Sequence, residues 1–156
     1  MDLLPRALRL VTIFQGDQKD KAGNPYLMHL LRVAGQCQTQ TEMIVAILHD
    51  IVEDAKDVSV EYITRRFGVD IGMAVNYLTR HDNDPYDRYI ERLRSNPLAR
   101  TVKLHDLIDH LRHEDQANLQ NMLKRRYRRA YYTLTGHHWD NIKHLPDGPD
   151  YGGTLR

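Results

Sequence analysis

Apolar residues recur at every third or fourth position along most of this 156-residue chain, and no segment sustains the alternation of a half-buried strand. Such spacing is typical of amphipathic α-helices. The chain is long enough to bury one sizeable core. The sequence therefore predicts an all-α fold, a compact single-domain bundle of about seven to eight helices. The longest helices are expected at residues 3–14, 25–38, 39–54, 97–112 and 116–134.

The helical periodicity stops after Gly136, where the sequence becomes rich in His, Pro and Gly. Terminal segments of this kind are often loosely packed. We therefore expect a helical domain over residues 1–135 and an irregular C-terminal tail over residues 136–156.

Charge and composition exclude several classes of protein. A net charge of +1 argues against a nucleic-acid partner, and no segment is long and apolar enough to predict a membrane span. The single cysteine, Cys37, excludes an intramolecular disulfide and favours a cytoplasmic location. The first residues lack the pattern of a signal peptide.

Ionisable residues interrupt the apolar segment at residues 47–54, which reads ILHDIVED. Buried ionisable groups are costly unless they are paired or bound to a metal ion. On one continuous helix Asp50, Glu53 and Asp54 would share a broad face, with His49 at its edge. An exposed acidic helix end is the alternative, but acids at a helix C-terminus oppose the helix dipole. A functional site is therefore favoured.

Two other segments offer further ligands for a metal ion. His29 lies within the apolar helix pattern PYLMHLLRVA, and Asp106 adjoins the apolar stripe of VKLHDLIDHL. A lone His in such a place is usually a hydrogen-bonded core residue, but a second His and two carboxylates are available here. Imidazole and carboxylate ligands suit zinc, manganese or iron. Three neighbours are expected to support the site or to lie at the surface: His105, Asp109 and His110.

Cationic side chains near these segments are candidates for binding phosphate groups. The candidate substrate-binding residues are Lys19, Lys21, Arg80, Lys103 and His110. The basic run at residues 124–129 is expected to be mostly a solvated helix face, and Tyr127 is expected to pack rather than to line a pocket.

Four ordered segments resemble the HD superfamily of metal-dependent phosphohydrolases. Within it, they are most similar to the ppGpp hydrolase domain of RelA/SpoT proteins and to the stand-alone small alarmone hydrolases. The segments fall roughly within residues 13–112 and read GNPYLMHLLRVA, AILHDIVEDA, YITRRFGVDIGMAVNYLTR and VKLHDLIDHLR.

The resemblance implies a helical fold around a central metal ion, usually Mn²⁺. By motif position the implied metal ligands are His29, His49, Asp50 and Asp106. The pair implied to polarise the attacking water is Glu53 and Asp54. The implied reaction of the stringent response removes pyrophosphate from the 3′ position of ppGpp or pppGpp. The resemblance further suggests a functional pairing with an alarmone synthetase.

The nucleotide-reading positions depart from the family pattern. The usual His-x-Gly-Gln is absent before the PY segment, where Gln18 or Lys19 takes the place of a basic residue that packs on guanine. His110 stands at the position of the family's Asn. The implied metal set is intact, so hydrolysis is expected with altered base recognition. The alternatives are an adenine alarmone, the 2′-phosphate of NADPH, or a non-catalytic module that binds a nucleotide or a partner protein.

Overall fold

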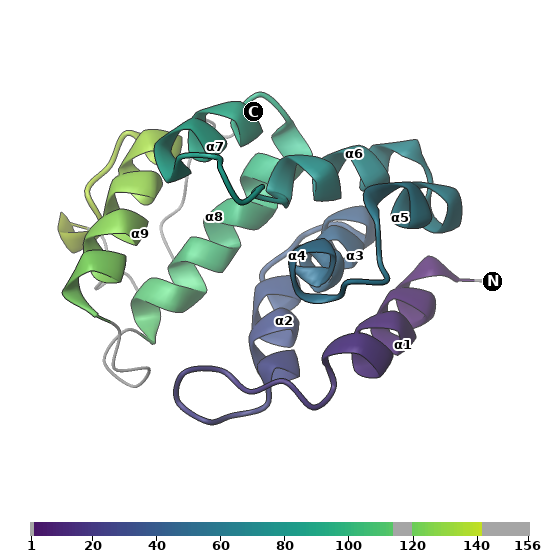
Figure 1. The fold of residues 1–156 in the computed structure, drawn as a ribbon. Helices are drawn as coiled ribbons and strands as arrows, with labels where there is room; N and C mark the ends of the chain where they lie inside the picture. The colour runs from purple at the N-terminus through teal and green to yellow at the C-terminus, as the bar shows by residue number, and fades with distance from the viewer. Residues whose placement is uncertain (1, 114–119, 142–156) are drawn as a thin grey trace.

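The computed structural model describes residues 2–113 and 120–141. These residues form nine α-helices and one 3₁₀ helix, and their only β-type pairing is an isolated bridge between Lys19 and Pro25. The all-α prediction is therefore confirmed. In chain order (Figure 1) the helices are α1 (Leu3–Gln15), α2 (Tyr26–Gly35), α3 (Gln40–Leu48), α4 (Ile51–Asp54), α5 (Val60–Phe67), α6 (Val69–Leu78), α7 (Tyr86–Leu93), α8 (Pro97–Arg112), α9 (Asn121–Thr135) and η1 (Trp139–Asn141).

Local sequence signals account for several helix starts. The Thr39 hydroxyl accepts a hydrogen bond from the backbone N–H of Glu42, whose carboxylate reaches back to the Thr39 backbone N–H, which makes a capping box. Ser59 caps α5, and Asn96 caps α8 ahead of Pro97 at the first helical position. The third helix therefore begins where the sequence predicts.

The end of that helix differs from the prediction. Instead of continuing to Asp54, α3 ends at Leu48 and α4 begins at Ile51, because Asp50 leaves the helical conformation with φ −106° and ψ −2°. This break accounts for the additional helix. It also places the side chains of His49 and Asp50 together, although adjacent residues on a regular helix diverge by about 100°.

Two apolar cores meet along α8. Residues from α1 to α6 form one core with Ala99 and Val102 from the first half of α8. Residues from α7, α9 and η1 form the other with Leu104, Leu107 and neighbours from the second half of α8. Figure 1 shows α8 running diagonally between these two groups of helices. Along α8 the first core ends at Val102 and the second begins at Leu104, and Asp106 follows just after this change.

The expected tail is partly described. Trp139, within η1, is buried and packs edge-on against Tyr131, with ring centroids 5.4 Å apart. Packing thus continues beyond residue 135. Residues 142–156 lie outside the described residues, so the division into domain and tail stays a prediction.

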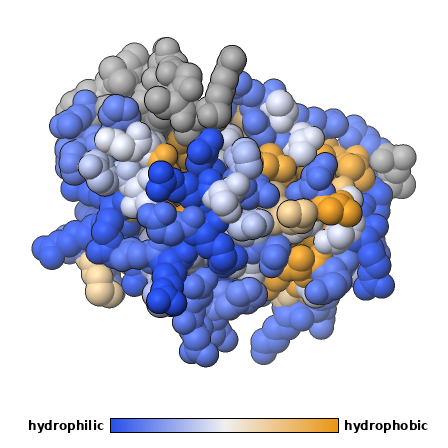
Figure 2. Space-filling view, turned by 90° about the horizontal axis from the view of Figure 1, so that it is seen from above, coloured by the Kyte–Doolittle hydropathy of each residue, from blue (hydrophilic) through white to orange (hydrophobic). Residues whose placement is uncertain are grey.

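Apolar side chains reach the surface unevenly. Seen from above, apolar patches gather on the side of the molecule that carries α5 and α6, whereas the side of α7 and α9 is mostly hydrophilic (Figure 2). Val69 and Met73 of α6 are among the exposed apolar residues. None of the described helices combines the length and apolar composition needed to cross a membrane.

A glycine allows α5 and α6 to pack closely. A Cβ at Gly72 would lie 2.1 Å from Oγ1 of Thr64, whose hydroxyl donates to the Val60 carbonyl. Gly72→Ala should therefore lower the free energy of unfolding by about 1–3 kcal/mol, measured by urea denaturation. Gly35→Ala is the control, because nothing lies within 4 Å of a Cβ there. Equal stability of the two variants would contradict this close packing.

Candidate active site

Four side chains from three parts of the chain converge between the two cores. Oδ1 of Asp106 lies 3.1 Å from Nε2 of His29 and 3.6 Å from Nε2 of His49. Nε2 of His49 also lies 3.1 Å from Oδ2 of Asp50. The structure thus brings together the four residues predicted as metal ligands. His110 adds a third imidazole, with Nε2 3.1 Å from Oδ1 of Asp106.

Three of these converging atoms are buried without a hydrogen-bond partner: Nε2 of His29, Nε2 of His49 and Oδ1 of Asp106. A buried polar atom left unsatisfied is destabilising, so their convergence needs an explanation. Two overlapping triplets, His29–His49–Asp50 and His29–Asp106–His110, each place ligand atoms within 4.8 Å of one another. Imidazole nitrogens and carboxylate oxygens around such a point fit a divalent cation.

The other ring nitrogens of the two histidines are engaged. Nδ1 of His49 lies 2.7 Å from the carbonyl oxygen of Ala46, which can only accept, so Nδ1 carries the proton. Nδ1 of His29 lies 2.7 Å from Oδ2 of Asp109. Donation from Nδ1 leaves the Nε2 lone pair free to bind a metal, as is usual for metal-ligating histidines.

Arg32 holds Asp109 against His29. Its Nε donates to Oδ1 of Asp109 at 2.8 Å, and its Nη2 donates to Oδ2 at 3.0 Å. Burial alone would raise the pKa of Asp109, but the hydrogen bonds from His29 and Arg32 lower that pKa to about 2. Asp109 is thus an ionised hydrogen-bond acceptor for His29. Of the two places expected for Asp109, at the surface or in support of the site, this geometry favours the second.

Lys103 neutralises the far oxygen of Asp106. Its Nζ donates to Oδ2 at 2.8 Å, and both side chains are almost fully buried. Burial would raise the pKa of Asp106, but Lys103 and His110 hold it well below its ordinary value. Conversely, burial would lower the pKa of Lys103, and Asp106 raises it instead. Lys103, predicted to bind substrate, is therefore already engaged by Asp106.

A first pocket of about 280 Å³ opens beside this cluster. Asp54 is fixed at its wall, because Gln15 and Gln18 donate to its Oδ2 at 2.9 and 3.1 Å. Glu53 accepts a hydrogen bond from the backbone N–H of Arg80. Partial burial raises the pKa of both carboxyl groups above their ordinary values. The pocket thus presents two proton-accepting groups next to the convergent ligand atoms.

A second pocket of about 240 Å³ adjoins the first. Its lining includes Lys19, Lys21 and Arg32, whereas Arg80 and Lys103 line the first pocket. Both pockets share Gln18, Tyr26, His110 and Tyr127. The candidate substrate-binding residues are thus divided between two adjoining spaces, and His110 belongs to both.

Several lining residues were missed by the sequence reasoning. Tyr127 was expected to pack, but it stacks on His110, with ring centroids 5.0 Å apart, and lines both pockets. Arg126, from the run expected to be mostly solvated, lines the first pocket. The hydroxyl of Tyr26 hydrogen-bonds to Asp50. In the sequence, the features that could have pointed to these residues were the basic run on α9 and the tyrosine next to Pro25.

Comparisons with known proteins agree with this picture. No family model matches the chain. A guanosine-3′,5′-bis(diphosphate) 3′-pyrophosphohydrolase of Aquifex aeolicus is 29% identical over 121 residues, which cover 70% of this chain and 17% of that protein. A putative chloroplastic GTP diphosphokinase, RSH1 of Oryza sativa, is 31% identical over 128 residues, with 68% and 14% covered. The chain thus spans less than a fifth of these curated relatives.

A solved structure shares the fold. It is a metazoan orthologue of SpoT, described as hydrolysing ppGpp and acting in starvation responses. It superposes with a TM-score of 0.72 over 87% of this chain and 85% of that one, at 21% identity. The sequence matches make this chain a homologue of the HD-type ppGpp hydrolase domains of SpoT-related proteins, and the solved structure shows that the helical fold is shared.

Proposed function

We propose that this protein hydrolyses the 3′-diphosphate of ppGpp, pppGpp or a similar alarmone and releases pyrophosphate in a reaction that requires a divalent metal ion, with Mn²⁺ as the first candidate. One observation carries the proposal. Three buried polar atoms without hydrogen-bond partners point at one another beside two carboxylates whose pKa values are raised. The name of the Aquifex aeolicus relative supports this choice of substrate.

The proposed metal ligands are His29, His49, Asp50 and Asp106. A divalent cation, when bound, supplies Lewis-acid chemistry that withdraws charge from phosphoryl oxygens. Asp109 and the Ala46 carbonyl fix the ring orientations of His29 and His49, so that both Nε2 atoms face the same point. Lys103 keeps Asp106 ionised.

We assign the proton transfer to Asp54. The attacking water gives its proton to this carboxylate as its oxygen forms a bond to the phosphorus next to the 3′ oxygen. The bond between that phosphorus and the 3′ oxygen breaks, and the 3′ oxygen takes a proton from solvent water as pyrophosphate leaves, while Asp54 returns its proton to solvent. Gln15 and Gln18 orient Asp54 through their hydrogen bonds. Glu53, which accepts a hydrogen bond from the backbone N–H of Arg80, positions the water. A raised pKa makes a carboxylate a better base near neutral pH.

Positive charge for the diphosphate comes from two guanidiniums on the wall of the first pocket. Arg80 and Arg126 both lie over the ring of Tyr86, at 5.9 and 5.1 Å from its centroid. Stacking restricts both side chains and leaves their N–H groups for phosphate oxygens. Lys19, Lys21, His110 and Tyr127 are proposed to hold the remainder of the nucleotide in the second pocket. Pairing with an alarmone synthetase and the cytoplasmic location stay predictions.

The first test is pyrophosphate release from ppGpp by the purified protein. With Mn²⁺ we expect steady release of one pyrophosphate per ppGpp, and with excess chelator we expect none, since the proposed chemistry needs the cation. A folded, metal-loaded protein that releases no pyrophosphate from ppGpp would contradict the proposal. Adenine alarmones and NADPH would then be assayed, because the base-reading positions depart from the family pattern.

The Arg32–Asp109 pair provides a further prediction. Arg32→Ala should weaken Mn²⁺ binding by up to about 10-fold, the lower end of the effect of removing the hydrogen-bond partner of a ligating histidine, because Arg32 acts on His29 only through Asp109. Isothermal titration would measure the affinity. Arg92→Ala is a matched control, because Arg92 is equally exposed at 36% and pairs with Asp84 away from the cluster. Identical Mn²⁺ affinity in both variants would remove Arg32 from this positioning role.

A further inference from the structure

A pocket of about 460 Å³ lies between α1 and α5, away from the candidate active site. We call it the α1–α5 pocket. Its lining residues are Arg6, Arg9, Leu10, Ile13, Phe14, Tyr62, Arg66 and Phe67. None of them lines either pocket of the candidate active site. Its size falls within the range of about 300–1,000 Å³ that is common for small-molecule sites.

The charged side chains that line this pocket are all positive. Three of its eight lining residues are arginines, and none carries a carboxylate. Arg6, Arg9 and Arg66 form no ion pair with an acidic residue anywhere in the part of the chain that the structure describes. Clustered like charges without counter-charges repel one another, and a bound anion would relieve that repulsion.

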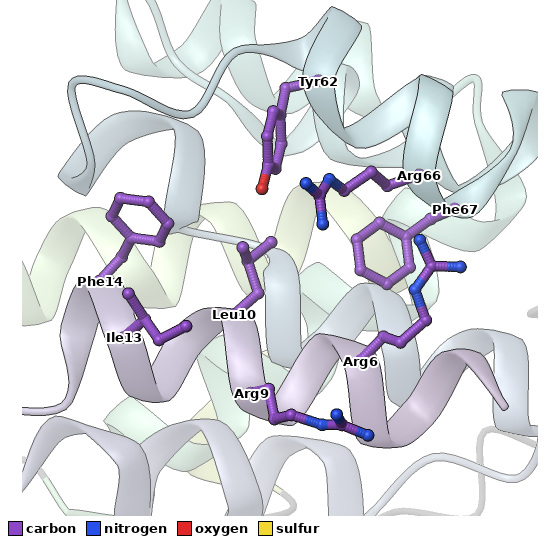
Figure 3. A pocket seen from close by; sticks show the side chains of 8 residues that line it. All are labelled: Arg6, Arg9, Leu10, Ile13, Phe14, Tyr62, Arg66 and Phe67. Carbon is purple, nitrogen blue, oxygen red and sulfur yellow. The ribbon is translucent and has the colours of Figure 1, made fainter. Parts of the chain in front are cut away.

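Two of the arginines are held by aromatic rings. The guanidinium carbon of Arg6 lies 5.6 Å from the centroid of Phe67, and that of Arg66 lies 4.6 Å from the centroid of Tyr62. These contacts use the faces of the guanidiniums and leave their N–H edges available. Figure 3 shows the guanidinium groups of Arg6 and Arg66 on either side of Phe67, one from α1 and one from α5.

The other end of the pocket is apolar. Ile13 and Phe14 lie there, on the last turn of α1, and Leu10 lies between them and the arginines (Figure 3). Ile13 is 75% exposed and Phe14 is 38% exposed. Tyr62 extends from α5 toward the middle of the pocket (Figure 3). The pocket therefore has a cationic end and an aromatic, apolar end.

We propose that the α1–α5 pocket binds a small phosphate monoester that carries an aromatic ring. Arg6 and Arg66 bind the phosphate through their N–H edges, and the ring lies against Tyr62, Phe14 and Ile13. A phosphate dianion matches several guanidiniums better than a singly charged group does. This inference does not depend on the proposed hydrolase activity.

The test is an NMR titration of the ¹⁵N-labelled full chain with phenyl phosphate. Saturable shifts are expected at the amides of Leu10, Phe14 and Tyr62. Phenyl phosphate should bind at least about tenfold more tightly than inorganic phosphate or phenol alone, because each of these fills only one end. Shifts confined to Glu53, Asp54 and their neighbours would assign the binding to the active site and overturn the proposal.

Variants separate the two ends of the pocket. Arg66→Gln should weaken phenyl phosphate binding by about tenfold or more. Arg65 is an exposed arginine on the same helix outside the lining, and Arg65→Gln should not change the affinity.

Ile13→Ser should weaken the binding of phenyl phosphate but not the binding of inorganic phosphate. Val69→Ser, at another exposed apolar residue, is its control. Wild-type affinity in Arg66→Gln, or octanoate binding as tightly as phenyl phosphate, would overturn the proposal. Pyrophosphate release by Arg66→Gln in the absence of phenyl phosphate should equal that of wild type.

Discussion

Asp54→Asn should lower kcat for pyrophosphate release from ppGpp by about 10²–10⁴-fold, the usual contribution of a general base. An asparagine has the same size, and its oxygen can still accept the hydrogen bonds that Gln15 and Gln18 donate to Asp54. It cannot take a proton from water. The variant should therefore keep its metal content and thermal stability while it loses turnover.

The matched control for this variant is Asp57→Asn. Asp57 is an exposed carboxylate three residues further along the chain that lines neither pocket of the candidate site. Its replacement should leave kcat and KM unchanged in the same assay. If Asp54→Asn turns over ppGpp at a rate near that of wild type, Asp54 is not the proton acceptor, and Glu53→Gln becomes the next variant to measure.

Periodicity was enough to predict the helical fold, and the candidate ligands stood out because each is an ionisable residue inside an apolar helix pattern. The break between α3 and α4 was not predictable in the same way. Residues 47–54 contain neither Gly nor Pro, so local preference favours one continuous helix. The backbone nevertheless departs from regular helical dihedrals at Asp50, and the side chains of His49 and Asp50 converge with those of His29 and Asp106.

Contacts between segments that are distant in the sequence were the other feature that the sequence pattern did not predict. Arg32 and Asp109 are 77 residues apart, and neither sequence pattern specifies that the exposed edge of α2 meets α8 at this point. Tyr127 and Arg126 lie on α9, where the run of basic residues is equally consistent with a solvated face. Only the packing of α9 against α8 turns these two side chains toward the pockets.

His49→Ala should abolish stable binding of the metal ion. The Nε2 atom of His49 is buried without a hydrogen-bond partner and faces Asp50 and Asp106, and alanine removes this nitrogen. The loss of Mn²⁺ affinity should exceed the roughly 100-fold upper end that is typical of supporting residues. Metal content after dialysis, measured by elemental analysis, should fall from about one ion per chain to near zero, and pyrophosphate release should be lost with it.

The control is His105→Ala, because His105 directly precedes Asp106 on α8 but lines neither pocket and burial lowers its pKa. This variant should keep both its metal ion and its activity.

Circular dichroism would establish that each variant is folded. His49→Asn, which keeps a polar side chain at the buried position, provides a second readout. Full metal content in folded His49→Ala would exclude His49 as a ligand. The convergence of its Nε2 atom on Asp106 would then reflect polar packing between the two cores, and the metal ion would have to be held by the triplet of His29, Asp106 and His110.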